Sequence, residues 1–159
     1  MKTKLITSLA LLLLTPQAMA YTWEKPIIVK NNSPFCAVTE RQVGYDIDAF
    51  YYPDSNKIYP CFEETDTQEW RDYAITHEMW HAFYYKSFND TQRDKIKQLY
   101  ELKPKYGFSY VNDYAKKNVD EFFAETRAKI LSWQYEINGK TDVEKAFQKK
   151  MIEVFNTFK

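Results

Sequence analysis

The sequence predicts an α+β fold in which a small antiparallel sheet is followed by a helical part. Before about residue 62, short runs of β-branched and aromatic residues alternate with turn residues, as expected for strands. Beyond that point, apolar residues recur at helical spacing between capping and stop signals. No internal repeat and no Gly/Ser-rich linker divides the chain. We therefore expect a single domain.

The expected strands are a β-prone run at 27–29 and a hairpin of Ala49–Tyr52 and Lys57–Tyr59 around a Pro-Asp-Ser-Asn turn. Four helices should follow. Asp66, with Glu69 three residues later, is typical of a helix start, and an Asn-Gly pair at 138–139 is typical of a helix end. The helices are expected at 66–86, 91–102, 119–137 and 142–158, with Asp90 capping the second helix and Pro104 following its end.

The first 20 residues have the three parts of a secretory signal peptide. Lys2 and Lys4 precede an apolar run from Leu5 to Leu14, and Ala18-Met19-Ala20 offers a small-x-small cleavage site. The run is shorter than the about 20 residues that span a bilayer, which argues against a retained membrane anchor. We expect residues 21–159 to form the mature domain, located in a periplasm or outside the cell.

Charge and cysteine content narrow the class of partner and the compartment. Removing Lys2 and Lys4 from 22 basic and 22 acidic residues leaves a formal charge of about −2, which gives no basis for nucleic-acid binding. Cys36 and Cys61 are the only cysteines, and an even pair in an exported protein predicts a disulfide bond. Zinc ligation by these cysteines is the weaker alternative, because they lack Cys-x-x-Cys spacing.

The only two histidines of the chain lie in the sequence His77-Glu78-Met79-Trp80-His81. Two histidines four residues apart share a helix face and can bind one metal ion, and the glutamate between them lies beside that ion as a general base. Apolar and aromatic residues flank the motif on most sides, which predicts a buried helix. The alternative, an accidental pair on a solvated face, fits those surroundings poorly. The motif therefore predicts one Zn2+ per chain.

A catalytic zinc site commonly has three protein ligands, so a carboxylate from another segment is needed. Glu121 and Glu125 are four residues apart on the expected helix at 119–137 and share one face with Ala128 and Ser132. They could instead be solvated carboxylates near a helix N-terminus, where negative charge is favoured. The spacing alone leaves both interpretations open.

Between Thr65 and Trp133 the sequence resembles the zinc metallopeptidases of the anthrax lethal factor type, His-Glu-x-x-His gluzincins that include secreted proline-proline endopeptidases of clostridia. The resemblance rests on the histidine motif and on Tyr114-x6-Glu121-Phe122-Phe123-Ala124-Glu125. It implies a minimal zincin-like domain with Glu121 as the third zinc ligand. It also implies that Tyr114 donates a hydrogen bond to the oxyanion. Glu125 then corresponds to a residue that orients a ligand.

These observations together predict a zinc endopeptidase that acts on a protein or peptide as a monomer. An extended substrate is expected to pair with the hairpin edge. The segment 105–114 is either a lid or a packed connector. Two other classes remain open: a non-catalytic zinc-binding module, and a protein-interaction module with an aromatic surface. Within the enzyme class, a toxin or a cell-wall amidase would use the same chemistry. The candidate groove residues are Tyr51, Tyr52, Ile58 and Tyr59.

Overall fold

A computed structural model describes residues 23–105, 112–132, 137 and 140–158. The expected signal peptide at 1–20 lies outside the described residues, as does most of the segment at 105–114. No helix in the described part of the chain is long and apolar enough to cross a membrane. Five α-helices and a three-stranded sheet are described, which confirms the α+β class.

The sheet is mixed, and the expectation that it would be wholly antiparallel was wrong. Strands β2 (Ala49–Tyr52) and β3 (Lys57–Pro60) form the predicted antiparallel hairpin, with Tyr51 opposite Ile58. Strand β1 (Ile27–Ile28) pairs in parallel with the other edge of β3. A parallel pair needs a crossover connection, and here the chain between β1 and β3 passes through a helix and β2. The order β1-β3-β2 leaves β2 at the edge.

That helix, α2 (Pro34–Val43), occupies a segment where strands and turns were expected. The residues interpreted as a turn are its start signal: the Ser33 side chain accepts a hydrogen bond from the Phe35 amide, and Pro34 occupies the first turn. Gly44 ends the helix in a left-handed conformation, with φ of 82°, where glycine is favoured. The sequence thus carries both a start and a stop signal for this helix, and the expectation of strands and turns at 34–43 was wrong.

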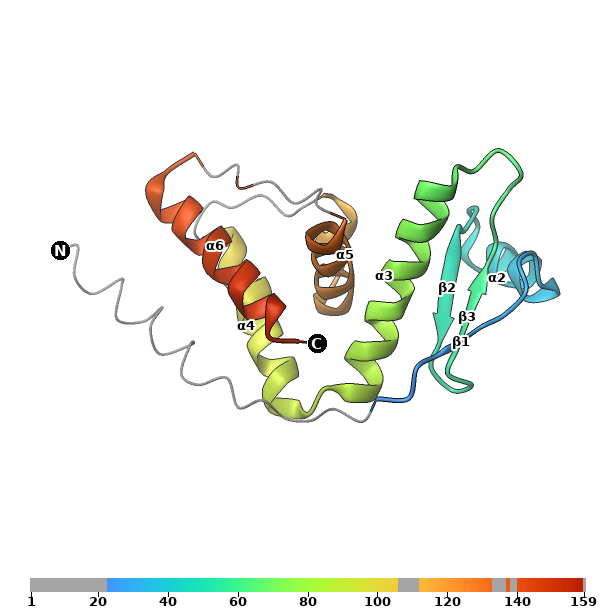
Figure 1. Cartoon of the computed structure of the whole chain (residues 1–159), viewed down its shortest axis with the longest axis horizontal. Coiled ribbons are helices and arrows are strands. Elements are labelled where there is room, and N and C mark those ends of the chain that lie inside the picture. The colour runs from blue at the N-terminus through green and yellow to red at the C-terminus, as the bar shows by residue number, and fades with distance from the viewer. Residues whose placement is uncertain (1–22, 106–111, 133–136, 138–139, 159) are drawn as a thin grey trace.

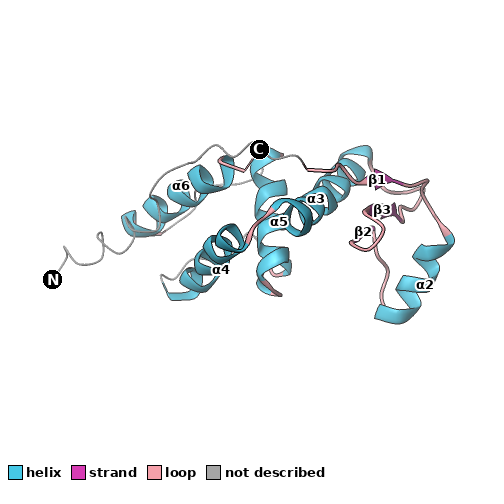
Figure 2. Cartoon of the chain, turned by 90° about the horizontal axis from the view of Figure 1, so that it is seen from below, coloured by secondary structure: helices cyan, strands magenta, loops and turns pink. Residues whose placement is uncertain are grey.

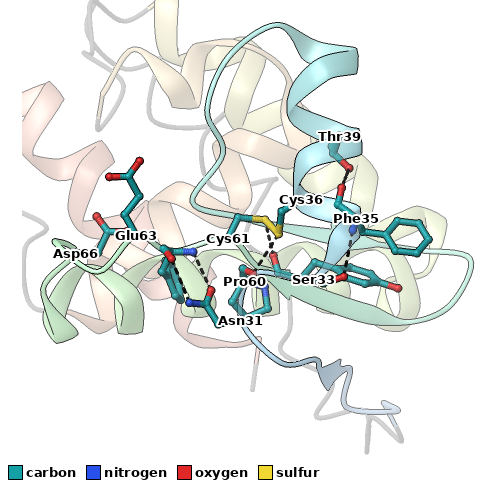
Figure 3. The surroundings of a disulfide bond; sticks show 11 residues. Asn31, Ser33, Phe35, Cys36, Thr39, Pro60, Cys61, Glu63 and Asp66 are labelled. Atoms are coloured by element: carbon teal, nitrogen blue, oxygen red, sulfur yellow. Dashed lines mark hydrogen bonds between the residues drawn. A yellow bond between two sulfur atoms is a disulfide. The ribbon is translucent and has the colours of Figure 1, made fainter.

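The predicted disulfide bond joins Cys36 of α2 to Cys61, directly after β3 (Figure 3). Beside it, the Asn31 side chain accepts a hydrogen bond from the Phe62 amide and donates one to the Phe62 carbonyl. These contacts fasten α2 and the β1 segment to the end of the hairpin. Figures 1 and 2 show α2 at the opposite end of the molecule from α4 and α6.

Helices α3 (Gln68–Ser87) and α4 (Asp90–Lys105) lie close to their predicted positions. Thr67, rather than Asp66, caps α3 by accepting a hydrogen bond from the Trp70 amide. Asn89, rather than Asp90, caps α4 through reciprocal side-chain bonds with Gln92. Helix α4 continues past Pro104 instead of ending near Leu102.

Helix α5 (Val119–Leu131) ends six residues before the predicted Ile137. The proposed stop at 138–139 lies outside the described residues. Helix α6 (Asp142–Asn156) begins with a capping box between Thr141 and Glu144. A short 3-10 turn, η1 (Tyr114–Lys116), precedes α5.

Aromatic side chains fill the space between the helices. Figure 1 shows α3 between the sheet on one side and the group α4, α5 and α6 on the other. The largest cluster contains Phe83 of α3, Phe122 and Phe123 of α5, and Phe155 of α6, each at most 1% exposed. Edge-to-face and tilted ring pairs connect them to Phe88 and Trp80. This packing fixes α5 against α3, and so fixes the relative positions of the polar residues on their facing sides.

Replacing both Cys36 and Cys61 with serine should lower the free energy of unfolding by about 3 kcal/mol, because the bond closes a loop of 25 residues. Urea denaturation of the oxidised protein and the double variant measures the difference. Adding a reductant should destabilise the parent by a similar amount and leave the double variant unchanged. Equal stability of reduced and oxidised parent would contradict the prediction.

Candidate metal centre

Helix α3 places His77 and His81 on one face, one turn apart, with their Nε2 atoms 3.0 Å apart. Both side chains are buried. Together with Glu78 they form a group that could hold a metal ion, since one ligand atom from each lies within 4.8 Å of the others. Two buried imidazole nitrogens that face each other are unfavourable unless a proton or a metal ion lies between them.

Helix α5 brings Glu121 to the same point. The Asn118 side chain caps the helix by accepting a hydrogen bond from the Glu121 amide, which fixes the first turn. The Glu121 Oε2 atom lies 3.1 Å from the Nε2 atoms of both His77 and His81. Zinc bonds of about 2.0–2.1 Å in a tetrahedron separate ligand atoms by about 3.3 Å. The three atoms are therefore spaced as the ligands of one tetrahedral metal ion could be.

The surrounding carboxylates favour a positive charge at this point. Burial acts to lower the pKa of His77, but hydrogen bonds to Glu121 and Glu125 and the charge of Glu78 outweigh it and raise that pKa to about 10. Burial acts to raise the pKa of Glu121, but its bonds to the two histidines lower it to about 2. A cation bound here would be stabilised by the same carboxylates.

Glu125 holds His77 from the other side of its ring. The His77 Nδ1 atom lies 2.9 Å from Glu125 Oε2 and donates to it, so Nε2 is the ring nitrogen that faces Glu121 and His81. Glu125 is 4% exposed and also accepts hydrogen bonds from the Tyr73 hydroxyl and the Asn112 amide. A carboxylate behind a histidine is the usual arrangement around a metal ligand.

Tyr73 and Asn112 were not predicted as site residues. Tyr73 lies one turn before His77 on the same face of α3, so helical spacing could have indicated it. Asn112 precedes η1 and carries no sequence signal. Residues in ascending order along α3 contact residues in descending order along α5, so the two helices run in opposite directions at this site. The pairs are Tyr73 with Glu125, His81 with Glu121, and Tyr85 with Asp120.

Glu78 lies beside the three candidate ligands and not among their closest contacts. Its Oε1 atom is 4.0 Å from His77 Nε2, whereas Glu121 Oε2 is 3.1 Å away. Its Oε2 atom accepts a 2.7 Å hydrogen bond from the Tyr51 amide on β2. Burial is the main cause that raises the pKa of Glu78. The carboxylate is thus anchored by one oxygen, with the other turned toward the histidines.

Tyr114, at the start of η1, also lies at this site. Its ring packs edge-to-face on His77 with centroids 5.8 Å apart, and 41% of the residue is exposed. Lys117 Nζ lies 3.6 Å from the Tyr114 ring centroid. Burial, followed by the charges of Glu121 and Glu78, raises the pKa of Tyr114. The phenol therefore remains protonated at neutral pH and can donate a hydrogen bond.

The four predicted groove residues differ in exposure. Ile58 is fully buried, and Tyr51 and Tyr59 are also buried. Tyr59 nevertheless lines a pocket between β3 and the start of α2, together with Lys57 and Phe35. Tyr59 stacks on Phe50, and Tyr51 stacks on Tyr85. Tyr52 is 44% exposed on the edge strand. The proposed lid at 105–114 lies largely outside the described residues.

Comparisons with protein-family models, curated proteins and solved structures found no match to this chain. The resemblance to lethal-factor-type metallopeptidases therefore depends on the motif residues alone. The fold and the site define the protein only as a class: an α+β protein with a buried group of histidine and glutamate residues that could hold a metal ion.

Replacing Glu121 with alanine should weaken zinc binding. Loss of a residue that only hydrogen-bonds to a metal ligand typically lowers the affinity by about 10–100-fold, and loss of a ligand should lower it further. Chelator competition measures the affinity, and metal analysis should find about one zinc per parent chain. Asp120→Ala is the matched control, because this neighbouring carboxylate bonds to Tyr85 instead of the histidines. Equal zinc affinities for the parent and Glu121→Ala would exclude Glu121 as a ligand.

Proposed function

We propose that this chain is an exported zinc-dependent endopeptidase in which His77, His81 and Glu121 hold the metal. The observation that carries the proposal is the position of Glu78, a half-buried carboxylate next to three candidate ligands but outside their closest contacts. A purely structural zinc site needs no such group. When bound, zinc polarises a peptide carbonyl and lowers the pKa of water toward about 7.

Glu78 is the proposed general base. Its Oε2 atom is held by the Tyr51 amide, which fixes the carboxylate and leaves Oε1 directed toward the ligands. In this position Oε1 accepts a proton from the attacking water and then delivers it to the leaving amine. Burial raises the pKa of Glu78. The carboxylate therefore holds the proton taken from water more readily until it delivers that proton to the leaving amine.

Tyr114 is the proposed donor to the developing oxyanion. Its ring contacts His77, and its raised pKa keeps the proton that such a hydrogen bond requires. The partial exposure of Tyr114 leaves it accessible to a substrate, unlike the buried histidines.

Strand β2 is the proposed substrate-binding edge. It is an edge strand of the sheet, and its Tyr51 amide contacts the proposed base directly. An extended peptide added along this edge would place its backbone beside Glu78. Tyr52 is the exposed side chain of β2 available to such a peptide.

The disulfide bond is consistent with the proposed export, since such bonds persist in oxidising compartments. The natural substrate is proposed only as a class: an extended protein or peptide segment.

Glu78→Gln should retain zinc and lose turnover by about 100- to 10,000-fold, the usual contribution of a general acid–base group. Cleavage of a quenched peptide library and zinc analysis of the same samples measure both quantities. Glu69→Gln, an exposed glutamate on the same helix, is the control. Turnover at the parental rate in Glu78→Gln would exclude Glu78 as the base. A zinc-loaded parent that cleaves no peptide would favour the non-catalytic zinc module.

Tyr114→Phe should lower kcat by about 100-fold with little change in zinc affinity, because one oxyanion donor is typically worth about 3 kcal/mol. Steady-state kinetics at saturating zinc measures the effect. Tyr45→Phe is a suitable control, since that ring also approaches Lys117, at 5.9 Å from its Nζ atom, but has no proposed role at the site. An unchanged kcat in Tyr114→Phe would remove the tyrosine from the mechanism.

A further inference from the structure

Asn112 joins two parts of the site that the sequence separates. Its Nδ2 atom donates to Glu125 Oε1, and its Oδ1 atom accepts a 2.9 Å hydrogen bond from the Ala115 amide. A carboxylate needs a donor and a backbone amide needs an acceptor, so the two partners determine the orientation of the side-chain amide. Asn112 therefore connects the residue behind His77 to the turn that carries Tyr114.

Both ends of this connection are buried. Glu125 is 4% exposed and Ala115 is fully buried, so each hydrogen bond is protected from competing water. Glu125 divides its oxygens between two roles: Oε2 faces His77 Nδ1, while Oε1 accepts from Tyr73 and Asn112. A change in the position of His77 would thus be transmitted to Asn112 through one rigid carboxylate.

Turn η1 is held at its last two residues. The Lys116 carbonyl accepts a 2.7 Å hydrogen bond from Tyr100 of α4, and the Asn112 side chain holds the Ala115 amide. Tyr114 directly precedes these two anchors. Loss of the Asn112 anchor would free the side of the turn nearer to Glu125.

We propose that Asn112 is a positioning residue that couples metal binding at His77 to the placement of the Tyr114 hydroxyl. The inference rests on the proposed function for the role of Tyr114, while the coupling itself requires only that the metal binds. Fixing His77 Nε2 fixes the Nδ1–H bond to Glu125, and Glu125 in turn fixes the Asn112 amide. Neither Ala nor an ionised Asp could replace Asn112, since neither supplies both a donor and an acceptor.

The test measures hydrogen exchange of the Ala115 amide, monitored by NMR, in the presence and absence of zinc. In the parent, zinc should slow this exchange by about fivefold or more, the effect of strengthening one hydrogen bond. In Asn112→Asp, which keeps an acceptor for Ala115 but loses the donor to Glu125, saturating zinc should have no effect. Asn31→Ala is the control. The Asn31 side chain also makes two hydrogen bonds, but it makes them to Phe62 beside the disulfide bond, so this variant should keep the parental response to zinc. A zinc response in Asn112→Asp equal to that of the parent would overturn the proposal, as would a zinc-loaded parent without any response.

Kinetics provides a second measurement. Asn112→Ala should lower kcat at saturating zinc, and the double variant with Tyr114→Phe should be no slower than Tyr114→Phe alone, because Asn112 acts through Tyr114. Independent, multiplicative losses would contradict the coupling. If the parent cleaves no peptide but zinc still slows exchange at Ala115 through Asn112, the proposed peptidase function fails and the coupling stands.

Discussion

The hydrogen bond from His77 Nδ1 to Glu125 is the interaction on which the rest of the site depends. It determines which ring nitrogen of His77 faces Glu121 and His81, and it uses a carboxylate that Tyr73 and Asn112 also hold. A buried carboxylate is costly unless it is fully bonded, and Glu125 accepts three hydrogen bonds. Helix α5 therefore contributes two glutamates with different tasks, one facing the shared point and one behind it.

The aromatic core and the disulfide bond support this arrangement from opposite ends. Phe122 and Phe123, between the two glutamates in the sequence, are fully buried and hold α5 against α3 and α6. Rigid side chains of this size fix a helix with few residues. At the other end, the Cys36–Cys61 bond holds α2 to the hairpin whose edge strand contacts Glu78. The carboxylates that face the histidines are thus positioned by α5, while Glu78 is held by an amide of the hairpin.

Much of the site was predictable because helical spacing is a local property. His77 and His81, and likewise Glu121 and Glu125, are four residues apart, and the structure brings the two pairs together. Asn112 could not be predicted, since its partners depend on how a turn packs against α5. Strand β1 was predicted as a strand, but its parallel pairing depends on the path of the chain through α2 and β2. The exposure of the hairpin side chains could not be predicted from the sequence either. Ile58 and Tyr59 are adjacent in a strand and point to opposite faces of the sheet, yet both are buried.

X-ray absorption at the zinc edge of the loaded protein is the most direct test of the central claim, that two helices of this chain together bind one catalytic metal ion. We expect two imidazole nitrogens and a carboxylate oxygen, at about 2.0–2.1 Å, with no sulfur ligand. A spectrum dominated by sulfur at about 2.3 Å, or by water oxygens without imidazole, would contradict it.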